Sequence, residues 1–147
     1  EIWSGGAYIY MQETAQDLPG RCFAVYAKPG DIGIVPPGWA HATIVADITQ
    51  NLTFGAWCVR DYGFDYDEVR AHKGVAWFPI VNENRIDFIA NQFYQKSQLI
   101  VKEPRIYEEF GIRKGIPIYQ QFVENPDLFL FVSQPQLAKE KWENFIP

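Results

Sequence analysis

Cysteine and histidine are scarce in this chain of 147 residues, which limits the metal and redox chemistry it can perform. The two cysteines, Cys22 and Cys58, do not have the close spacing of a zinc motif. We expect both to be free thiols, as is usual in the cytoplasm, where we expect this protein to reside. The two histidines are His41 and His72, so imidazole chemistry within the chain depends on them.

Runs of basic residues and long apolar stretches are also missing. The net charge is −5 and Lys and Arg form no cluster, which argues against a nucleic-acid partner. The apolar runs fall far short of the roughly 18 residues of a membrane helix, and no signal peptide is visible, so we expect no membrane partner. An anionic sugar phosphate remains a possible ligand, because a local site on an acidic protein can be positive or hold a metal ion.

Aromatic residues are abundant. They make up 16% of the chain, and hydrophobic residues make up 48%, a composition that excludes a disordered protein. The length is that of one domain with a core of its own. The chain contains no internal repeats and no low-complexity stretches.

The first part of the chain has the pattern of an all-β protein. Short segments of β-type composition alternate with turns containing Gly, Pro or Asn, as in a barrel or sandwich. Strands are expected within residues 1–12 (strand, turn, strand), 21–27, 32–35, 42–46, 52–59, 75–81 and 85–90. A loop at 61–66 and a helical turn at 67–72 interrupt this series, and residues 82–84 are the turn of the last hairpin.

Residues 91–147 have a mixed pattern. Proline and acidic residues at 104–110 predict a short helix that Gly111 caps. Residues 116–123 and 128–132 have the composition of strands, and 134–145 has the spacing of an amphipathic helix. We therefore divide the chain into a barrel, 1–90, and a C-terminal α+β extension, 91–147, which packs on the barrel or forms a dimer arm.

Residues 30–41 form the segment with the strongest functional pattern. An apolar strand stops at Pro36, because proline cannot donate a hydrogen bond to a sheet ladder. Gly38 allows a corner, and His41 then begins the next strand. A histidine in that position either is a satisfied core residue or points into a cavity, and spacing alone does not decide between these alternatives.

The pattern Gly30-x5-Pro36-x-Gly38-x2-His41 resembles the second motif of the cupin family. Residues 35–41, together with 61–66, are similar to the cupin-type glucose-6-phosphate isomerases of archaea and some bacteria. The resemblance covers residues 1 to about 81. It implies an antiparallel β-barrel of the double-stranded β-helix or jelly-roll type, with part of the barrel preceding Glu1, and a homodimer as the default assembly.

The resemblance also implies a metal site. Cupins bind a divalent first-row metal, here Fe, Mn, Ni or Zn, through a His-x-His pair, a glutamate and the motif histidine. Glu1 and His41 match the last two ligands, and the pair is expected upstream of Glu1, so this chain alone should bind metal weakly or not at all. His72 lies in a charged loop, and we expect it to face solvent rather than to bind the metal.

Three residues receive substrate roles from the same resemblance. Glu1 is the expected general base as well as a metal ligand, and the alternative is a frayed terminal residue without a role. Tyr66 matches the aromatic loop of the isomerases and is expected to contact substrate. Thr43 could offer its hydroxyl, although a plain strand threonine is the simpler interpretation.

The implied function is metal-dependent aldose–ketose isomerisation, which interconverts glucose 6-phosphate and fructose 6-phosphate in glycolysis and gluconeogenesis. A cupin that binds a sugar or sugar phosphate without converting it is the alternative, and a cupin oxygenase is a third hypothesis. Trp3, Cys58 and Phe64 stand where the isomerases have tyrosine or histidine, and Val45 stands in place of an asparagine. These changes favour the binding alternative.

Overall fold

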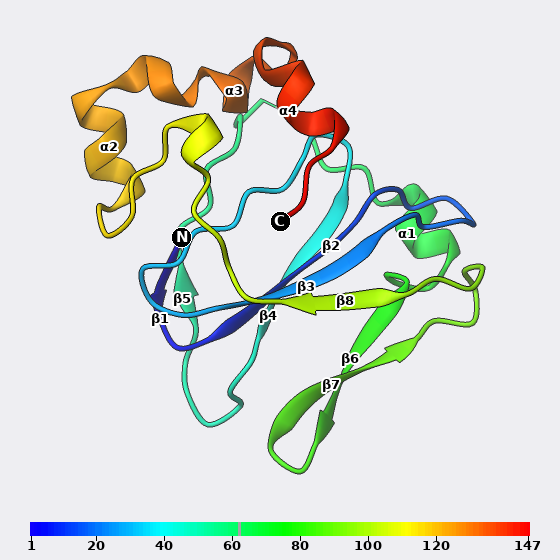
Figure 1. Ribbon diagram of the computed structural model, residues 1–147. Helices are drawn as coiled ribbons and strands as arrows, with labels where there is room; N and C mark the ends of the chain where they lie inside the picture. The colour runs from blue at the N-terminus through cyan, green and yellow to red at the C-terminus, as the bar shows by residue number, and fades with distance from the viewer. Residues whose placement is uncertain (62) are drawn as a thin grey trace.

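The structure is a computed structural model that describes residues 1–61 and 63–147. The chain is mainly β, which confirms the predicted class, and its described strands lie in three sheets (Figure 1). The largest sheet, hereafter the main sheet, contains β2 (Ala7–Gln12), β3 (Cys22–Ala27), β4 (Ala40–Val45) and β8 (Leu99–Lys102). Two-stranded sheets form from β1 (Ile2–Ser4) with β5 (Thr53–Phe54), and from β6 (Trp77–Asn82) with β7 (Arg85–Ala90).

The main sheet has the order β4-β2-β3-β8. Its pairs are antiparallel except for β3 and β8, which are parallel, so β8 departs from the expected antiparallel arrangement. Side chains alternate between the two faces of each strand. We call the face that carries Ile9, Met11, Phe23 and Val25 the inner face, because these residues belong to one buried cluster that also includes Ile2 of β1.

The opposite, outer face of the main sheet is covered by the β6–β7 hairpin. Tyr8 and Tyr10 both contact Phe88 of β7, with ring centroids 5.3 and 6.3 Å apart. The predicted hairpin is confirmed, and its turn lies at Glu83 and Asn84, both of which have positive φ. Such φ values are those of a tight two-residue hairpin turn, whose twist suits the paired strands.

The C-terminal region is helical where we predicted strands. The described helices are α1 (Asp67–Ala71), α2 (Ile118–Glu124), α3 (Leu130–Ser133) and α4 (Lys139–Glu143), and short 3₁₀ turns lie at Glu108–Phe110, Pro126–Phe129 and Pro135–Ala138. The strands predicted at 116–123 and 128–132 are therefore wrong, and the helix predicted at 134–145 is broken. Gly111 does cap the 3₁₀ turn before it, with φ of 73°.

A second core joins this helical region to the segment 32–34, which precedes the proline-glycine corner. Its buried members are Ile34, Tyr107, Phe110, Ile112, Ile118, Phe129, Ala138 and Phe145. Ile34 comes from the segment 32–35, which was predicted as a strand but forms no ladder, because it packs against the helical region instead. Trp57 likewise contacts Phe129, although the predicted strand 52–59 is reduced to β5. The C-terminus lies between the helices and the main sheet (Figure 1).

Helices of the membrane-spanning kind were not found: within 1–61 and 63–147, each helix is too short or too polar to cross a bilayer.

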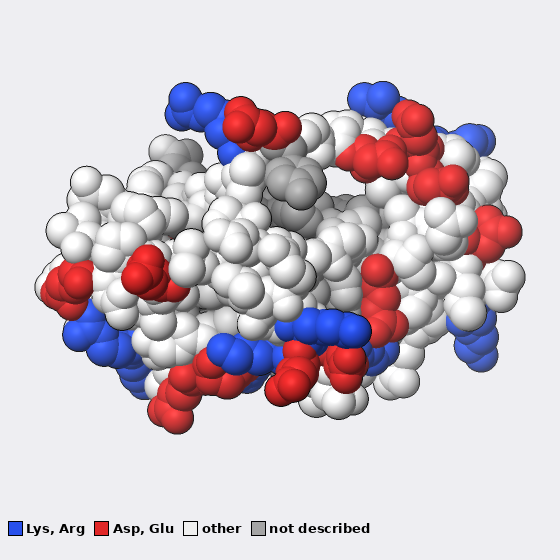
Figure 2. Space-filling model, turned by 90° about the horizontal axis from the view of Figure 1, so that it is seen from above, with Lys and Arg blue, Asp and Glu red and all other residues white. Residues whose placement is uncertain are grey.

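Viewed from the side that carries α2, α3 and α4, charged side chains gather toward the edges of the molecule and much of the centre is uncharged (Figure 2).

Candidate functional site

His41 and Thr43 lie side by side on the inner face of the main sheet. In the antiparallel register of β4 and β2, His41 is opposite Met11 and Thr43 is opposite Ile9. Residues that are directly opposite in such a pair project from the same face. Met11 and Ile9 are buried in the inner cluster, and the two polar side chains of β4 flank this cluster, His41 exposed and Thr43 half-buried.

The proline-glycine corner fixes the start of β4. The N–H of Trp39 donates to the carbonyl of Pro36 at 3.3 Å, and Gly38 has φ of 81°, a conformation that suits glycine. Trp39 stacks on Phe23 with a centroid distance of 6.1 Å and an interplanar angle of 11°. The corner is therefore anchored to the inner face two residues before His41.

The imidazole of His41 has one nitrogen engaged and one open. Nδ1 lies 3.3 Å from the backbone oxygen of Trp39. A carbonyl oxygen can only accept, so Nδ1 is the donor in this hydrogen bond, and Nε2 makes no hydrogen bond with the described residues. His41 is exposed, and its Nε2 can bind a metal ion or a substrate proton, in the arrangement common for histidine ligands.

Glu1 is held in place rather than frayed. Its backbone nitrogen donates to the carbonyl of Gly55 at 3.1 Å, and its Oε2 accepts hydrogen bonds from Trp3 Nε1 at 3.2 Å and from the N–H of Ile118 at 3.3 Å. The carboxylate thereby satisfies the first N–H of α2, which otherwise lacks a side-chain cap. Oε1 makes no hydrogen bond with the described residues.

No hydrogen bond or ion pair among the described residues joins Glu1 to His41. Ile2 belongs to the inner cluster, and side chains alternate along β1, so Glu1 and Trp3 point away from that cluster. Across residues 1–61 and 63–147, no three His, Cys, Asp or Glu side chains are close enough to hold a metal ion. The residues present therefore do not by themselves fit the expected metal, and the roles of Glu1 and His41 as ligands stay predictions.

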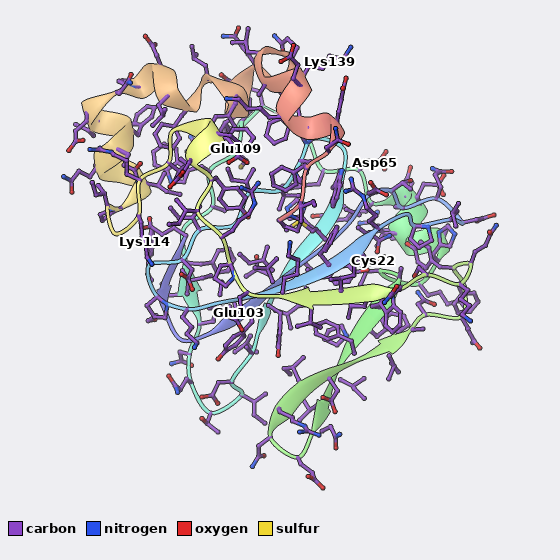
Figure 3. All side chains as sticks on the ribbon, viewed as in Figure 1. Cys22, Asp65, Glu103, Glu109, Lys114 and Lys139 are labelled. Atoms are coloured by element: carbon purple, nitrogen blue, oxygen red, sulfur yellow. The ribbon has the colours of Figure 1, made fainter. Side chains whose placement is uncertain are left out.

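Tyr66 belongs to an exposed aromatic loop. It precedes α1, stacks on Phe64 with centroids 6.0 Å apart, and lies under the guanidinium of Arg70 at 5.2 Å. Its neighbour Asp65 accepts a hydrogen bond from the N–H of Asp67, and Figure 3 shows Asp65 on this loop. Tyr62 of the family pattern lies outside the described residues. The substrate role of Tyr66 stays a prediction, because no described contact links Tyr66 to His41 or Thr43.

His72 corrects a prediction, because it is buried instead of facing solvent. Its Nδ1 lies 2.7 Å from the carbonyl of Glu68, and its Nε2 lies 2.9 Å from Oδ1 of Asp17. Tyr94 stacks on the ring, with centroids 4.2 Å apart. The helical turn of α1 places His72 one turn after Glu68, and a loop far away in sequence supplies its carboxylate. The ring therefore has a structural role, because both of its nitrogens are already engaged by protein acceptors.

A pocket lies on the outer face of the main sheet, away from His41. Its volume is about 420 Å³, and it is lined by residues of the main sheet and of the β6–β7 hairpin, among them Tyr8, Trp77 and Phe88. None of the predicted site residues lines it. Cys22 is buried on the same outer face, at the position that Figure 3 labels, and Cys58 is exposed; both are free thiols as predicted.

Lys102 is an inner-face residue that our reading of the sequence missed. It ends β8, a strand absent from our predictions, and its register partner Val25 belongs to the inner cluster. The segment Leu99–Lys102 does have β-type composition, which could have revealed the strand. Its parallel pairing with β3 depends on a partner far away in sequence, which composition does not reveal.

Comparison with known proteins identified one family. The family model described as Glucose-6-phosphate isomerase (GPI) matches residues 5–97. The matched region is more than half of the chain and contains His41, Thr43 and Tyr66. Neither the curated proteins nor the solved structures contain a significant match.

Proposed function

The chain belongs to the glucose-6-phosphate isomerase family, and from this premise we propose that it interconverts glucose 6-phosphate and fructose 6-phosphate. The observation that carries the proposal is the family match across residues 5–97, which includes the inner-face pair His41 and Thr43. An open imidazole nitrogen and a hydroxyl, two residues apart on one strand, can contact the same sugar.

The reaction moves a hydrogen between C1 and C2 and a proton between the two attached oxygens. In the proposed site, Nε2 of His41 and the hydroxyl of Thr43 hold sugar oxygens at the margin of the apolar inner face. Glu1 keeps the role of general base that the resemblance implies. Its support is the open Oε1 atom, while Oε2 is held by two N–H donors.

Metal dependence, a homodimer and a cytoplasmic location are further parts of the proposal. The first two come from the family resemblance, and the free cysteines add support for the third. A divalent metal would polarise the sugar oxygens as a Lewis acid; the resemblance assigns His41 and Glu1 to it, although no described contact brings these two side chains together. No step above passes through a metal, because the described residues do not assemble a full ligand set.

A second candidate is a sugar-phosphate-binding protein without turnover. The observation that favours it is the separation of Glu1 from the inner face, which leaves His41 without an acidic partner among the described residues. Trp3, Cys58 and Phe64, which replace polar residues of the isomerases, add support.

The test is isomerisation of glucose 6-phosphate, followed by NMR of the sugar carbons, with EDTA or with added Fe, Mn, Ni or Zn. We expect turnover that His41→Ala lowers, and that EDTA abolishes if the metal part of the proposal holds. Saturable binding of glucose 6-phosphate without turnover under all metal conditions would establish the second candidate. Light scattering on the same sample tests the homodimer.

A further inference from the structure

The indole of Trp39, two residues before His41, is enclosed by aromatic rings from two regions of the molecule. It stacks on Phe23 of β3, and it meets the ring of Phe145 edge-on, with centroids 6.4 Å apart and an interplanar angle of 84°. Phe145 belongs to the segment after α4, which Figure 1 shows beside the start of β4. This C-terminal segment lies outside residues 5–97, which the family model matches, yet it contacts the corner that precedes the histidine.

Arg21 adds a cation to this contact. Its guanidinium carbon is 5.4 Å from the centroid of the Trp39 ring, within the range of a cation–π interaction. Its Nη1 donates to the backbone carbonyl of Phe145 at 2.9 Å, and its Nε pairs with Glu13 at 2.6 Å. The guanidinium is therefore held on three sides, and it fixes both the indole and the C-terminal segment to the residue that precedes β3.

The backbone alone holds the corner loosely. The hydrogen bond from the N–H of Trp39 to the carbonyl of Pro36 is long, at 3.3 Å. Pro37 and Gly38 are exposed, and no described residue packs against the position that a side chain of Gly38 would occupy. The indole is thus the anchor of the corner, and the orientation of the Trp39 peptide depends on the groups that surround the indole.

The orientation of that peptide affects the imidazole of His41. The ladder with β2 fixes the backbone of His41, opposite Met11. The ring itself is exposed, and its Nδ1 is held by the backbone oxygen of Trp39 at 3.3 Å. A displaced indole would turn this carbonyl away and release the ring without breaking β4. The side chain could then occupy other rotamers on an intact strand.

We infer that Arg21 is a positioning residue that acts on His41 through Trp39, and that the C-terminal segment takes part through Phe145. The inference rests on the proposed function for its kinetic consequence, because an imidazole that holds sugar oxygens must be oriented toward them. Arg21 itself touches no substrate. It holds the indole, the indole holds the carbonyl, and the carbonyl selects which ring nitrogen is left to face a ligand.

The first test observes the ring directly, by ¹⁵N NMR of the imidazoles at a pH of about 8, above the usual pKa of histidine. The chain has two histidines, so His72 is an internal control. We expect Nδ1 of His41 to carry the proton in the wild type. In Arg21→Met the Nε2–H form should increase, with the resonances of His72 unchanged. Arg85→Met, at an exposed arginine that also pairs with a carboxylate, is the matched control and should resemble the wild type.

Kinetics of the isomerisation are the second test. We expect Arg21→Met to lower kcat by about tenfold, with a smaller change in KM. Arg21→Lys keeps the charge but loses the planar fork, so it should recover part of kcat and show a smaller NMR shift. Unfolding midpoints show whether each variant is folded, and Arg21→Lys supplies both measurements if Arg21→Met does not fold.

The outcomes separate this inference from the proposed activity. Unchanged resonances of His41 in a folded Arg21 variant would overturn it, even if the wild type isomerises the sugar. Equal shifts at His41 and His72 would overturn it too, because they would indicate general loosening. A selective shift at His41 with wild-type kcat would refute the positioning role. A selective shift in a protein that shows no turnover would support the action of Arg21 on the ring and refute the isomerase.

Discussion

At the scale of single residues, Glu1 connects two parts of the molecule and is also the proposed base. One carboxylate oxygen is held by Trp3 and by the first N–H of α2, and the other is open. Glu1→Gln keeps an oxygen acceptor but removes the negative charge that a base requires. We expect isomerase turnover to fall by about 10²- to 10⁴-fold, the usual contribution of a general base, with a smaller change in KM.

The control for this variant is Glu143→Gln, which changes an exposed carboxylate at the end of α4. Circular dichroism shows whether the loss of charge at Glu1 has also loosened α2. A folded Glu1→Gln protein with wild-type turnover would remove Glu1 from the mechanism.

His72 makes the stability dependent on pH. Both ring nitrogens face acceptors, the Glu68 carbonyl and the Asp17 carboxylate, and both hydrogen bonds together require the protonated ring. These partners raise the pKa of His72 above 6.5 in the folded state, mainly through the hydrogen bond to the Glu68 carbonyl and then that to Asp17. A group whose pKa is raised on folding stabilises the protein fully below its unfolded pKa, and loses this effect as the pH rises through the folded value.

We therefore expect the unfolding midpoint to fall as the pH rises from about 6.5 through the folded pKa of His72. Asp17→Asn removes the carboxylate and should move this decline to lower pH, and His72→Gln should remove its contribution. Thermal unfolding at a series of pH values is the measurement. An identical pH profile in the wild type and His72→Gln would contradict the assignment.

At the scale of elements, one buried amide joins the main sheet to the segment that leads into the hairpin. Oε1 of Gln12 accepts from the Tyr10 hydroxyl and from the N–H of Ala76, each at 2.8 Å, and its Nε2 donates to the carbonyl of Thr14 at 2.8 Å. Gln12→Leu keeps the volume but leaves these partners unsatisfied. We expect the free energy of unfolding to fall by about 2–4 kcal/mol.

Urea unfolding measures this loss, and Gln136→Leu, at an exposed glutamine, is the control. If both variants lose the same small amount, the buried amide does not secure the hairpin.

The hairpin turn contains a strained residue. Glu83 has φ of 47° and Asn84 has φ of 68°, and this left-handed region is costly for glutamate but tolerated by asparagine. Glu83→Asn is expected to stabilise the protein by about 0.5–1 kcal/mol, seen as a higher unfolding midpoint. An unchanged or lower midpoint would show that the side chain of Glu83 contributes more than its backbone costs.

The sequence reveals elements whose signals are local. The hairpin turn at 82–84 and the alternation in β2 and β3 are readable because the residues that specify them are neighbours. Residues 116–123 mislead because they are rich in Ile, Tyr and Val. The structure instead buries Ile118 and Gln121 on one face of α2, with Phe122 half-buried beside them, a helical spacing that the sequence also contains. Packing against the second core decides between the two patterns.

The candidate site is less readable than the elements. The pattern of residues 30–41 identified His41 and the family, because the corner and its histidine are adjacent in sequence. The position of Lys102 beside Val25, and the contact of Glu1 with α2, join residues that are far apart in sequence. No pattern within one segment encodes such pairs, which is why Lys102 was missed and why Glu1 was expected beside His41.

At the scale of the whole molecule, the two cores are in contact. Phe145 is 2% exposed and packs in the second core, yet it also meets Trp39 of the corner, with centroids 6.4 Å apart. The carbonyl of Phe145 accepts from Arg21, beside β3. The helical region and the main sheet should therefore unfold together, as expected for an extension that packs on the barrel rather than one that forms a dimer arm.

Phe145→Ala tests this coupling, because it empties space on the boundary between the cores. We expect a loss of about 3–5 kcal/mol in the free energy of unfolding, and a single transition in both the wild type and the variant. Tryptophan fluorescence and the far-ultraviolet signal should change at the same urea concentration. If the helical signal is lost before the sheet signal, the regions are independent. The corner that holds His41 would then not need the C-terminal segment, whereas a shared transition makes the site and that segment one folding unit.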